Sequence, residues 1–320
     1  MTGPIVDVTS HTNLGSAIDS AKSGSTIVFA PGEYSISTSI KLPSNITLKG
    51  THGVYVNYTG PRTSSGLFSL SNDSNVNISG ITFNGSGLSK LTNGVIEVSG
   101  AHNVHITGNT FNNVTNTSDL MMYNGNNIYF QDNTSGPNEL QPVSAHLTSN
   151  SNLTGLYITD NKFLGYSRMG VEIQNNTRSH TWSNVNVDGN TFHNSADLEY
   201  GALSFVTGSA KTRNTIEGNT FYGNNTGRDS AIELGSAITE VANNTIDHVG
   251  WAFSISASKG SAIEHNTVND TWHAVFSKDG GFTTSALPWI GANVMNGASI
   301  TGADRELGNL PGVPKPSFAI

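Results

Sequence analysis

A short phrase built around asparagine returns along most of this 320-residue chain. Two clear copies are NVHITGNTF at 103–111 and NVNVDGNTF at 184–192. The corresponding asparagines stand at positions 109, 133, 161, 190, 219, 244 and 266, at intervals of 24, 28, 29, 29, 25 and 22 residues. A repeat of this length predicts a solenoid, in which each repeat covers the apolar face of its neighbour.

The repeat is made of strands. In the pattern V-x-I-x-G-N-x-F apolar and polar residues alternate, and Gly-Asn allows a left-handed turn. A second alternating strand lies between successive asparagine phrases, as in GVIEVSG (94–100) and MGVEIQN (169–175). Two or three short strands per turn, with no helix inside the repeat, predict an all-β, parallel β-helix. The repeated asparagines would then stack into an internal hydrogen-bonded ladder, with the phenylalanines stacked beside them.

Composition excludes several classes of function. The net charge of −8 gives no electrostatic reason to bind nucleic acid or an anionic membrane. No apolar run approaches the ~18 residues of a membrane span. The absence of cysteine excludes disulfides, thiolate metal sites and a cysteine nucleophile. The first residues, MTGPIVDV, show no signal-peptide pattern, although we expect a secreted, extracellular protein.

The two ends differ from the repeats. NLGSAIDSAKSG (13–24) has apolar residues at helical spacing, so residues 1–24 are predicted to form a helical N-terminal cap. Residues 25–282 form the predicted β-helix domain. From about Thr283 onward no repeat is visible and prolines recur, which predicts an irregular C-terminal cap or tail over 283–320.

These segments together resemble a known superfamily. AIDSAKSGSTIVFAPGEY (17–34) followed by IKLPSNITLKG (40–50) and asparagine-rich coils is similar to the right-handed parallel β-helix proteins of the pectin-lyase-like superfamily. The resemblance covers roughly residues 10–282. That superfamily contains glycoside hydrolases, polysaccharide lyases, uronan epimerases and phage depolymerases, so the resemblance implies action on a polysaccharide laid along the coil axis.

One outward position of the second strand is rich in carboxylates. It holds Glu97, Glu172, Ser204, Glu233 and Ser254, each between two inward apolar residues. Glutamate is depleted in strands, so three glutamates among five residues is unusual. The column is either a solvated outer face or the floor of a site.

The turns that lead into this strand carry most of the reactive side chains in the middle of the chain. If successive turns stack, these side chains converge along one edge of the coil as a groove for a sugar polymer. Aromatic rings stack on pyranose faces, and arginine forms forked hydrogen bonds to hydroxyls or carboxylates. Tyr166 and Arg168 are expected on the rim beside Glu172. The expected substrate-binding residues are Arg168, Tyr166, Tyr200, Arg228, His248, Trp251, Trp272 and His273.

The spacing of the acids suggests a reaction. Neighbouring strands lie ~4.8 Å apart, which separates Glu172 and Glu233, two coils apart, by about 9–10 Å. Inverting glycosidases place their acid and base ~6.5–9.5 Å apart, whereas retaining enzymes need ~5 Å. The sequence therefore favours an inverting glycoside hydrolase without a required cofactor or metal site. The candidate catalytic residues are Glu172, Glu233, Asp197, Glu199 and Asp229.

Two alternatives remain. A lyase or C5-epimerase acting on a polyuronate would need a base, an acid and neutralisation of the uronate carboxylate. Ca²⁺ held at Glu172, Asp197 and Glu233 could neutralise the carboxylate. The other groups could come from Arg168, Tyr166, Tyr200, Arg228 and His248. The Lys-then-Arg arrangement of alginate and chondroitin lyases and the Asp-Pro-His motif of mannuronan epimerases are absent from the sequence. A glycan-binding adhesin or phage-spike module needs no catalysis, and such a coil exists as a monomer or a homotrimer.

Overall fold

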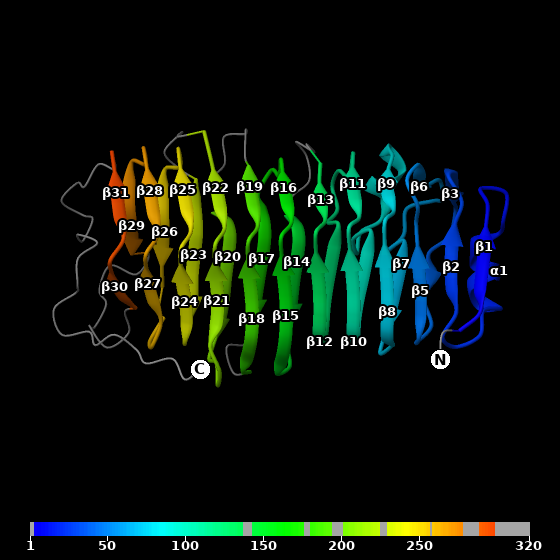
Figure 1. Cartoon of the computed structure of the whole chain (residues 1–320), viewed down its shortest axis with the longest axis horizontal. Helices are drawn as coiled ribbons and strands as arrows, with labels where there is room; N and C mark the ends of the chain where they lie inside the picture. Colours follow the sequence, from blue (N-terminus) through cyan, green and yellow to red (C-terminus); the bar gives the residue numbers. More distant parts are fainter. Residues whose placement is uncertain are drawn as a thin grey trace. The chain divides into compact units, whose positions relative to one another are not determined.

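The computed structural model describes residues 3–136, 143–175, 180–193, 201–224, 229–256, 258–277 and 288–297. Within these residues it consists almost entirely of β-strands, and its strand pairs are parallel. The chain forms two compact units: unit 1 comprises Met1–Leu147 with Asp160–Ser167, and unit 2 comprises Thr148–Thr159 with Arg168–Ile320. In each unit the strands that pair with each other lie side by side and run the same way (Figure 1).

Each coil has three strands, called faces 1, 2 and 3 in chain order. In unit 1, face 1 contains β4 (Ile40–Lys41), β7 (Phe68–Ser71), the first parts of β10 (Ile96–Thr107) and β12 (Leu120–Gln131), and the beginning of β14 (Val143–Ser149). Face 2 contains β1 (Ile5–Val8), β2 (Thr26–Phe29), β5 (Ile46–Lys49), β8 (Ser74–Ser79) and the second parts of β10 and β12. Face 3 contains β3 (Gly32–Ile36), β6 (Val54–Tyr58), β9 (Thr82–Asn84), β11 (Thr110–Asn112), β13 (Thr134–Ser135) and β16 (Lys162–Leu164). A 3-10 helix, η1 (Ser86–Lys90), follows β9.

Unit 2 repeats the same three-strand coil. Face 1 contains β17 (Met169–Asn175), β20 (Gly201–Gly208), β23 (Ser230–Ser236), β26 (Trp251–Ile255) and β29 (His273–Ser277). Face 2 contains β15 (Leu153–Thr159), β18 (Trp182–Asp188), β21 (Asn214–Glu217), β24 (Thr239–Ala242), β27 (Ala262–Glu264) and β30 (Trp289–Gly291). Face 3 contains β19 (Thr191–His193), β22 (Thr220–Tyr222), β25 (Thr245–Asp247), β28 (Thr267–Asn269) and β31 (Val294–Asn296).

The repeated asparagine lies at the corner between faces 2 and 3 and points inward. In unit 2 the side-chain Nδ2 of Asn190 donates to Oδ1 of Asn219 at 3.0 Å, and the same bond continues to Asn244, Asn266 and Asn293 at 2.9, 2.8 and 2.9 Å. In unit 1, Asn109, Asn133 and Asn161 are linked in the same way at 3.2 and 3.1 Å. The predicted internal ladder is confirmed within each unit.

The residue before each inward asparagine has a left-handed backbone. Gly108, Gly189 and Gly218 have φ between 63° and 68°, and Asp132 and Asp160 have 55° and 57°. Glycine takes this conformation without steric cost, and aspartate and asparagine tolerate it better than other residues do. This one-residue bend turns the chain sharply enough for the next residue to point its amide into the core.

The phenylalanine two positions after the asparagine also points inward. Phe192 and Phe221 stack with ring centroids 4.7 Å apart and planes within 5° of parallel, and Phe83 and Phe111 stack at 5.0 Å. All four rings are fully buried. The predicted phenylalanine stack is therefore confirmed, and it fills the core beside the asparagine ladder with closely packed apolar surface.

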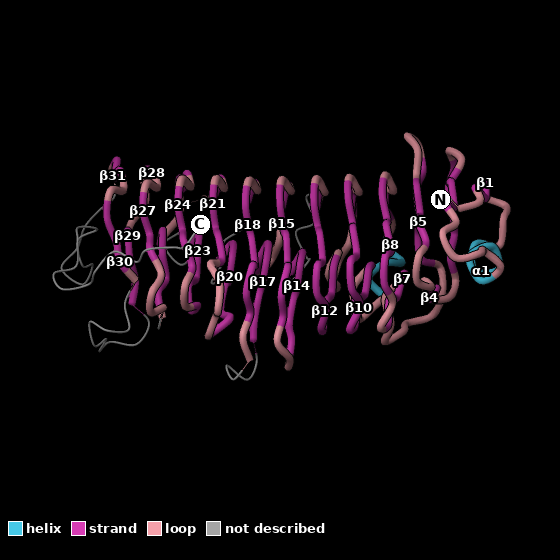
Figure 2. Tube along the Cα trace, turned by 60° about the horizontal axis from the view of Figure 1, so that its bottom comes forward, coloured by secondary structure: helices cyan, strands magenta, loops and turns pink. Residues whose placement is uncertain are grey.

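The N-terminal cap is less helical than predicted. The helix α1 (Leu14–Asp19) has six residues and begins where the side chain of Asn13 accepts the N–H of Ser16 at 3.0 Å. The strand β1 precedes it and pairs with β2, so the first residues belong to the coil itself. Figure 2 shows α1 as a short cyan segment beside β1. α1 ends at Asp19, so the prediction of helix up to residue 24 is wrong. The helix buries only Leu14 and Ile18.

The repeat also continues past the predicted end of the coil. From about Thr283 an irregular tail was expected, yet β30 pairs with β27 and β31 pairs with β28. Asn293 accepts from Asn266 and extends the ladder by one more step. Sequence analysis missed this coil because Ala292 stands at the left-handed corner, with φ 55°, in place of the usual glycine or asparagine.

Replacing a ladder asparagine tests how much the corner contributes to stability. Asn219 accepts the N–H and Nδ2 of Asn190 and donates to the carbonyl of Val187. Asn219→Ala leaves these buried groups without partners, which costs about 2–4 kcal/mol of unfolding free energy, measured by chemical denaturation. Asn296→Ala removes one exposed hydrogen bond to Asn269 and should change stability by less than about 0.5 kcal/mol. Equal losses in the two variants would contradict a structural role for the ladder.

Candidate active site

The carboxylate column predicted from the sequence lies on face 1 of unit 2. Glu172 pairs in register with Ser204, Ser204 with Glu233, and Glu233 with Ser254. Glu172 and Glu233 are therefore on the same side of the coil and two coils apart. Glu97 lies on face 1 of unit 1, in register with Ser69 and Met121.

Glu172 is held by cationic and amide donors. Its side chain is 4% exposed, whereas that of Arg168 is 33% exposed. The guanidinium of Arg168 donates to both carboxylate oxygens, with Nη1 3.1 Å from Oε1, and the Nε2 of Gln174 donates to Oε1 at 2.7 Å. This forked geometry is the strong form of an arginine–carboxylate pair. Glu172 was expected to form the open floor of a groove, but it lies beneath Arg168 instead.

Glu233 has a different environment. Its side chain is half-buried, and its Oε2 accepts the hydroxyl of the fully buried Ser204 at 2.8 Å. Ser204 thus orients Glu233 from the coil that separates it from Glu172. The two-coil separation corresponds to about 9–10 Å between the two backbone positions.

Asp229 supports the turn that precedes face 1. Asp229 is 4% exposed. Its side-chain Oδ1 accepts a hydrogen bond from the N–H of Gly250 at 2.9 Å, and its backbone carbonyl accepts one from the N–H of Trp251. Asp229 was predicted to be catalytic. In this structure the side chain instead holds the turn before β26 through Gly250, and a catalytic role for Asp229 stays a prediction.

Tyr166 was expected on the rim of the groove. Its side chain is 1% exposed, so the prediction of a rim residue is wrong. A tyrosine in a turn has enough apolar surface to fold inward, which its position in the sequence does not reveal. Four further candidates, Asp197, Glu199, Tyr200 and Arg228, lie outside the described residues.

Aromatic side chains mark the beginning of face 1 in the last coils. Trp251 and His273 pair in register, and their rings stack with centroids 4.0 Å apart. Trp272 is 50% exposed. In this register His273, and not Trp272, lies opposite Trp251. The stacked pair and the exposed indole place aromatic surface at the beginning of face 1.

A second aromatic line was missed in the sequence. His193, Tyr222 and His248 follow one another at the end of face 3, with ring centroids 5.3 and 5.4 Å apart. His248 was predicted to bind substrate beside face 1. The signal for His193 and Tyr222 was their place directly after an inward phenylalanine, which the alternation of a strand points outward. His248 lies one position further along, after Asp247.

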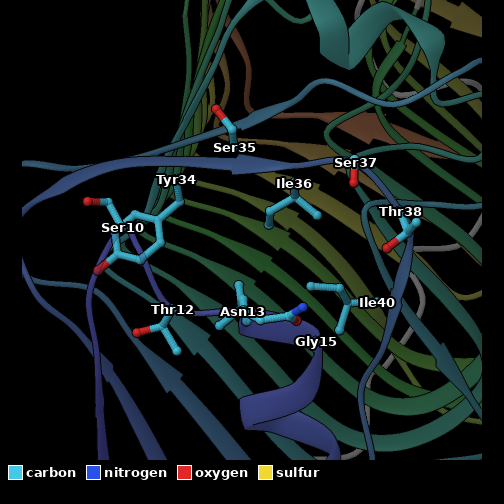
Figure 3. A pocket seen from close by; sticks show the side chains of 11 residues that line it. Ser10, Thr12, Asn13, Gly15, Tyr34, Ser35, Ile36, Ser37, Thr38 and Ile40 are labelled. Atoms are coloured by element: carbon cyan, nitrogen blue, oxygen red, sulfur yellow. The ribbon is translucent and has the colours of Figure 1, made fainter.

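The structure has a hollow of about 180 Å³ at the N-terminal end of unit 1. Figure 3 shows it between Tyr34 and Ile36 on one side and Thr12 and Asn13 on the other, with Ile40 at one end. Tyr34 is the only ionisable residue that lines this hollow. The Tyr34 hydroxyl donates hydrogen bonds to the carbonyls of Val8 and Ala30. Burial raises the pKa of Tyr34. The hollow therefore lacks an acid–base pair.

The family model for the right-handed β-helix region matches residues 143–308, which is more than half of the chain. The chain belongs to the right-handed β-helix family. The parallel β-helix predicted from the repeat is thereby confirmed, and so is the right-handed coil that the resemblance implied. Comparison with curated proteins finds no match to this sequence.

Several solved structures share the fold of this β-helix protein. The tailspike protein gp49 of the Acinetobacter baumannii bacteriophage Fri1, a capsular polysaccharide depolymerase, has a TM-score of 0.65 at 13% identity, over 96% of this chain and 63% of its own. The A-module of the Azotobacter vinelandii mannuronan C-5 epimerase AlgE6 has a TM-score of 0.59 at 14% identity, over 91% of each chain. The PL6 family alginate lyase AlyGC has a TM-score of 0.53 at 15% identity, over 94% of this chain and 53% of its own.

The chain thus spans about two thirds of the tailspike and about half of the lyase. At these identities the likeness concerns the fold. Among the described residues, no helix is long and apolar enough to cross a membrane.

The pairing of Arg168 with Glu172 can be tested by stability. Arg168→Met leaves the buried carboxylate without its cation and should lower the free energy of unfolding by about 1–3 kcal/mol, since one third of the arginine is still solvated. The double variant Arg168→Met/Glu172→Gln should recover part of that loss. The coupling in this double-mutant cycle, measured by denaturation, should be at least about 1 kcal/mol. Additive effects would show that the ion pair does not hold the site together.

Proposed function

We propose that this β-helix protein is a glycoside hydrolase that cleaves a polysaccharide lying along face 1 of unit 2. The observation that carries the proposal is the register that places Glu172 and Glu233 on one face, two coils apart. Exposed indole at Trp272 and the Trp251–His273 stack supply surface for sugar rings on the same side of the coils. A capsular polysaccharide depolymerase, an epimerase and an alginate lyase share the fold, which supports a glycan as the ligand.

The two carboxylates differ in a way that suits separate roles. Glu172 accepts N–H donors at both oxygens, so it acts only as an acceptor and suits the base that activates water. Glu233 accepts a neutral hydroxyl from Ser204 and suits the acid that protonates the leaving oxygen. Their backbone positions are about 9–10 Å apart, close to the ~6.5–9.5 Å that separates the carboxyl groups of inverting enzymes.

Arg168 would act in both binding and positioning. A guanidinium has five N–H donors, so it can hold Glu172 and still donate to a substrate hydroxyl or carboxylate. Its partial exposure places it between solvent and the carboxylate. A glycan that draws Arg168 toward itself would uncover Glu172 for reaction with water.

A lyase or C5-epimerase acting on a polyuronate is the second candidate. The shared fold of an alginate lyase and a mannuronan epimerase favours it, and Arg168 could neutralise a uronate carboxylate. Glu172 does not fit the calcium ligand considered from the sequence, because Arg168 donates to both of its oxygens and would repel a second cation. An elimination at this site would therefore rely on arginine at that position.

Product chemistry separates these functions. Purified protein is incubated with a panel of acidic and neutral polysaccharides, and reducing ends and ultraviolet-absorbing unsaturated products are measured together. Reducing ends without ultraviolet absorption support hydrolysis, and absorption supports elimination. Binding of a glycan without any cleavage would instead support a C5-epimerase or the adhesin or phage-spike interpretation. An extracellular location and a monomeric or homotrimeric state remain proposals.

Substitution of the two acids tests the assignment. Glu172→Gln and Glu233→Gln should each lower the rate of glycan cleavage by about 10²–10⁴-fold, because each removes a proton-transfer group. The Glu217→Gln variant changes a carboxylate of face 2 and should cleave the glycan at the normal rate. The folded state of each variant is checked by circular dichroism. Normal turnover in both face 1 variants would refute the proposed catalytic pair.

A further inference from the structure

Three metal-binding side chains meet at the end of face 3 in two successive coils. Asp247 ends β25, His248 follows it, and Asp270 follows β28 in the next coil. Asp247 pairs in register with Asn269, which places His248 and Asp270 at the same corner of neighbouring coils. One ligand atom of each side chain lies within 4.8 Å of those of the other two. Among the described residues, no other three such side chains come together in this way.

The corner holds these groups in place and leaves them accessible. His248 and Asp247 have side chains that are 43% and 29% exposed, and the imidazole Nδ1 lies 2.6 Å from Oδ1 of Asp247. The ring of Tyr222 packs on that of His248 at a centroid distance of 5.4 Å. Stacked strands fix the two backbones, and the ligand atoms of the two coils lie within 4.8 Å of one another at a corner that solvent can reach.

We propose that Asp247, His248 and Asp270 form a binding site for a transition-metal dication such as Zn²⁺. One imidazole and two carboxylates provide three protein ligands, and zinc sites of this kind keep a further position for water. An imidazole ligand favours zinc over calcium and magnesium, which prefer oxygen ligands alone. The site is separate from the carboxylate column of face 1 and does not depend on the proposed hydrolysis.

The expected consequence is a clamp between two coils. The metal would join the end of β25 to the turn after β28. The same corner leads through Val249 and Gly250 to Trp251, which opens β26 on face 1. Metal that binds the folded chain but not the unfolded chain raises the unfolding temperature.

The test uses the full chain, which is first treated with a chelator to remove bound metal. The chelator is then removed. Zn²⁺ is titrated by calorimetry, and Co²⁺ by its visible absorption, which reports nitrogen and oxygen ligands. The wild-type chain should bind one Zn²⁺ and gain thermal stability. His248→Asn and Asp270→Asn should each weaken binding at least about 10-fold. Asparagine suits both positions because their φ values are 53° and 44°.

His265 provides the matched control. It also has a positive φ, 56°, and lies 3.4 Å from a carboxylate, that of Glu264, but it belongs to no group of three among the described residues. His265→Asn should bind Zn²⁺ as the wild type does. The proposal is overturned if the wild-type chain shows no saturable Zn²⁺ binding, if the two site variants bind within twofold of wild type, or if Ca²⁺ binds more tightly than Zn²⁺. These measurements use no glycan, so their outcome is independent of whether the protein cleaves one.

Discussion

The inward asparagine at the corner between faces 2 and 3 is the interaction on which the remaining structure depends. A sharp bend buries backbone groups that have no partner within their own coil, and a buried unpaired amide or carbonyl costs about 1–3 kcal/mol. Asn219 meets this demand by bonding to Asn190, Asn244 and the carbonyl of Val187. Because its partners lie in neighbouring coils, the ladder also fixes the register between coils.

That register creates columns of side chains. Once Val171 and Ile173 face the core, Glu172 must face outward, and its counterparts in later coils fall on the same line. Glu172 and Glu233, which are about 60 positions apart in the chain, thus lie on the same face with only one strand between them. The proposed metal corner follows from the same rule, since Asp270 reaches His248 only because their strands stack in register.

Side-chain contacts then distinguish members of a column. Glu172 and Glu233 share a line, yet one is covered by arginine and the other is held by a serine hydroxyl. Asp229 comes from a similar turn but serves the backbone of Gly250. A chain with few charges can place acids at several points of one surface, and the local donors decide which of them can take part in proton transfer.

The sequence by itself determined the coil, the inward asparagines and phenylalanines, and the line that contains Glu172, Ser204 and Glu233. These follow from a period of two within strands and a repeat between them, which are local properties of the chain. The tertiary structure alone decided that Tyr166 is buried, that Arg168 covers Glu172, and that Ala292 serves as a left-handed corner. The burial and pairing of a turn residue depend on side chains from other coils. The spacing of residues along one coil contains no information about those side chains.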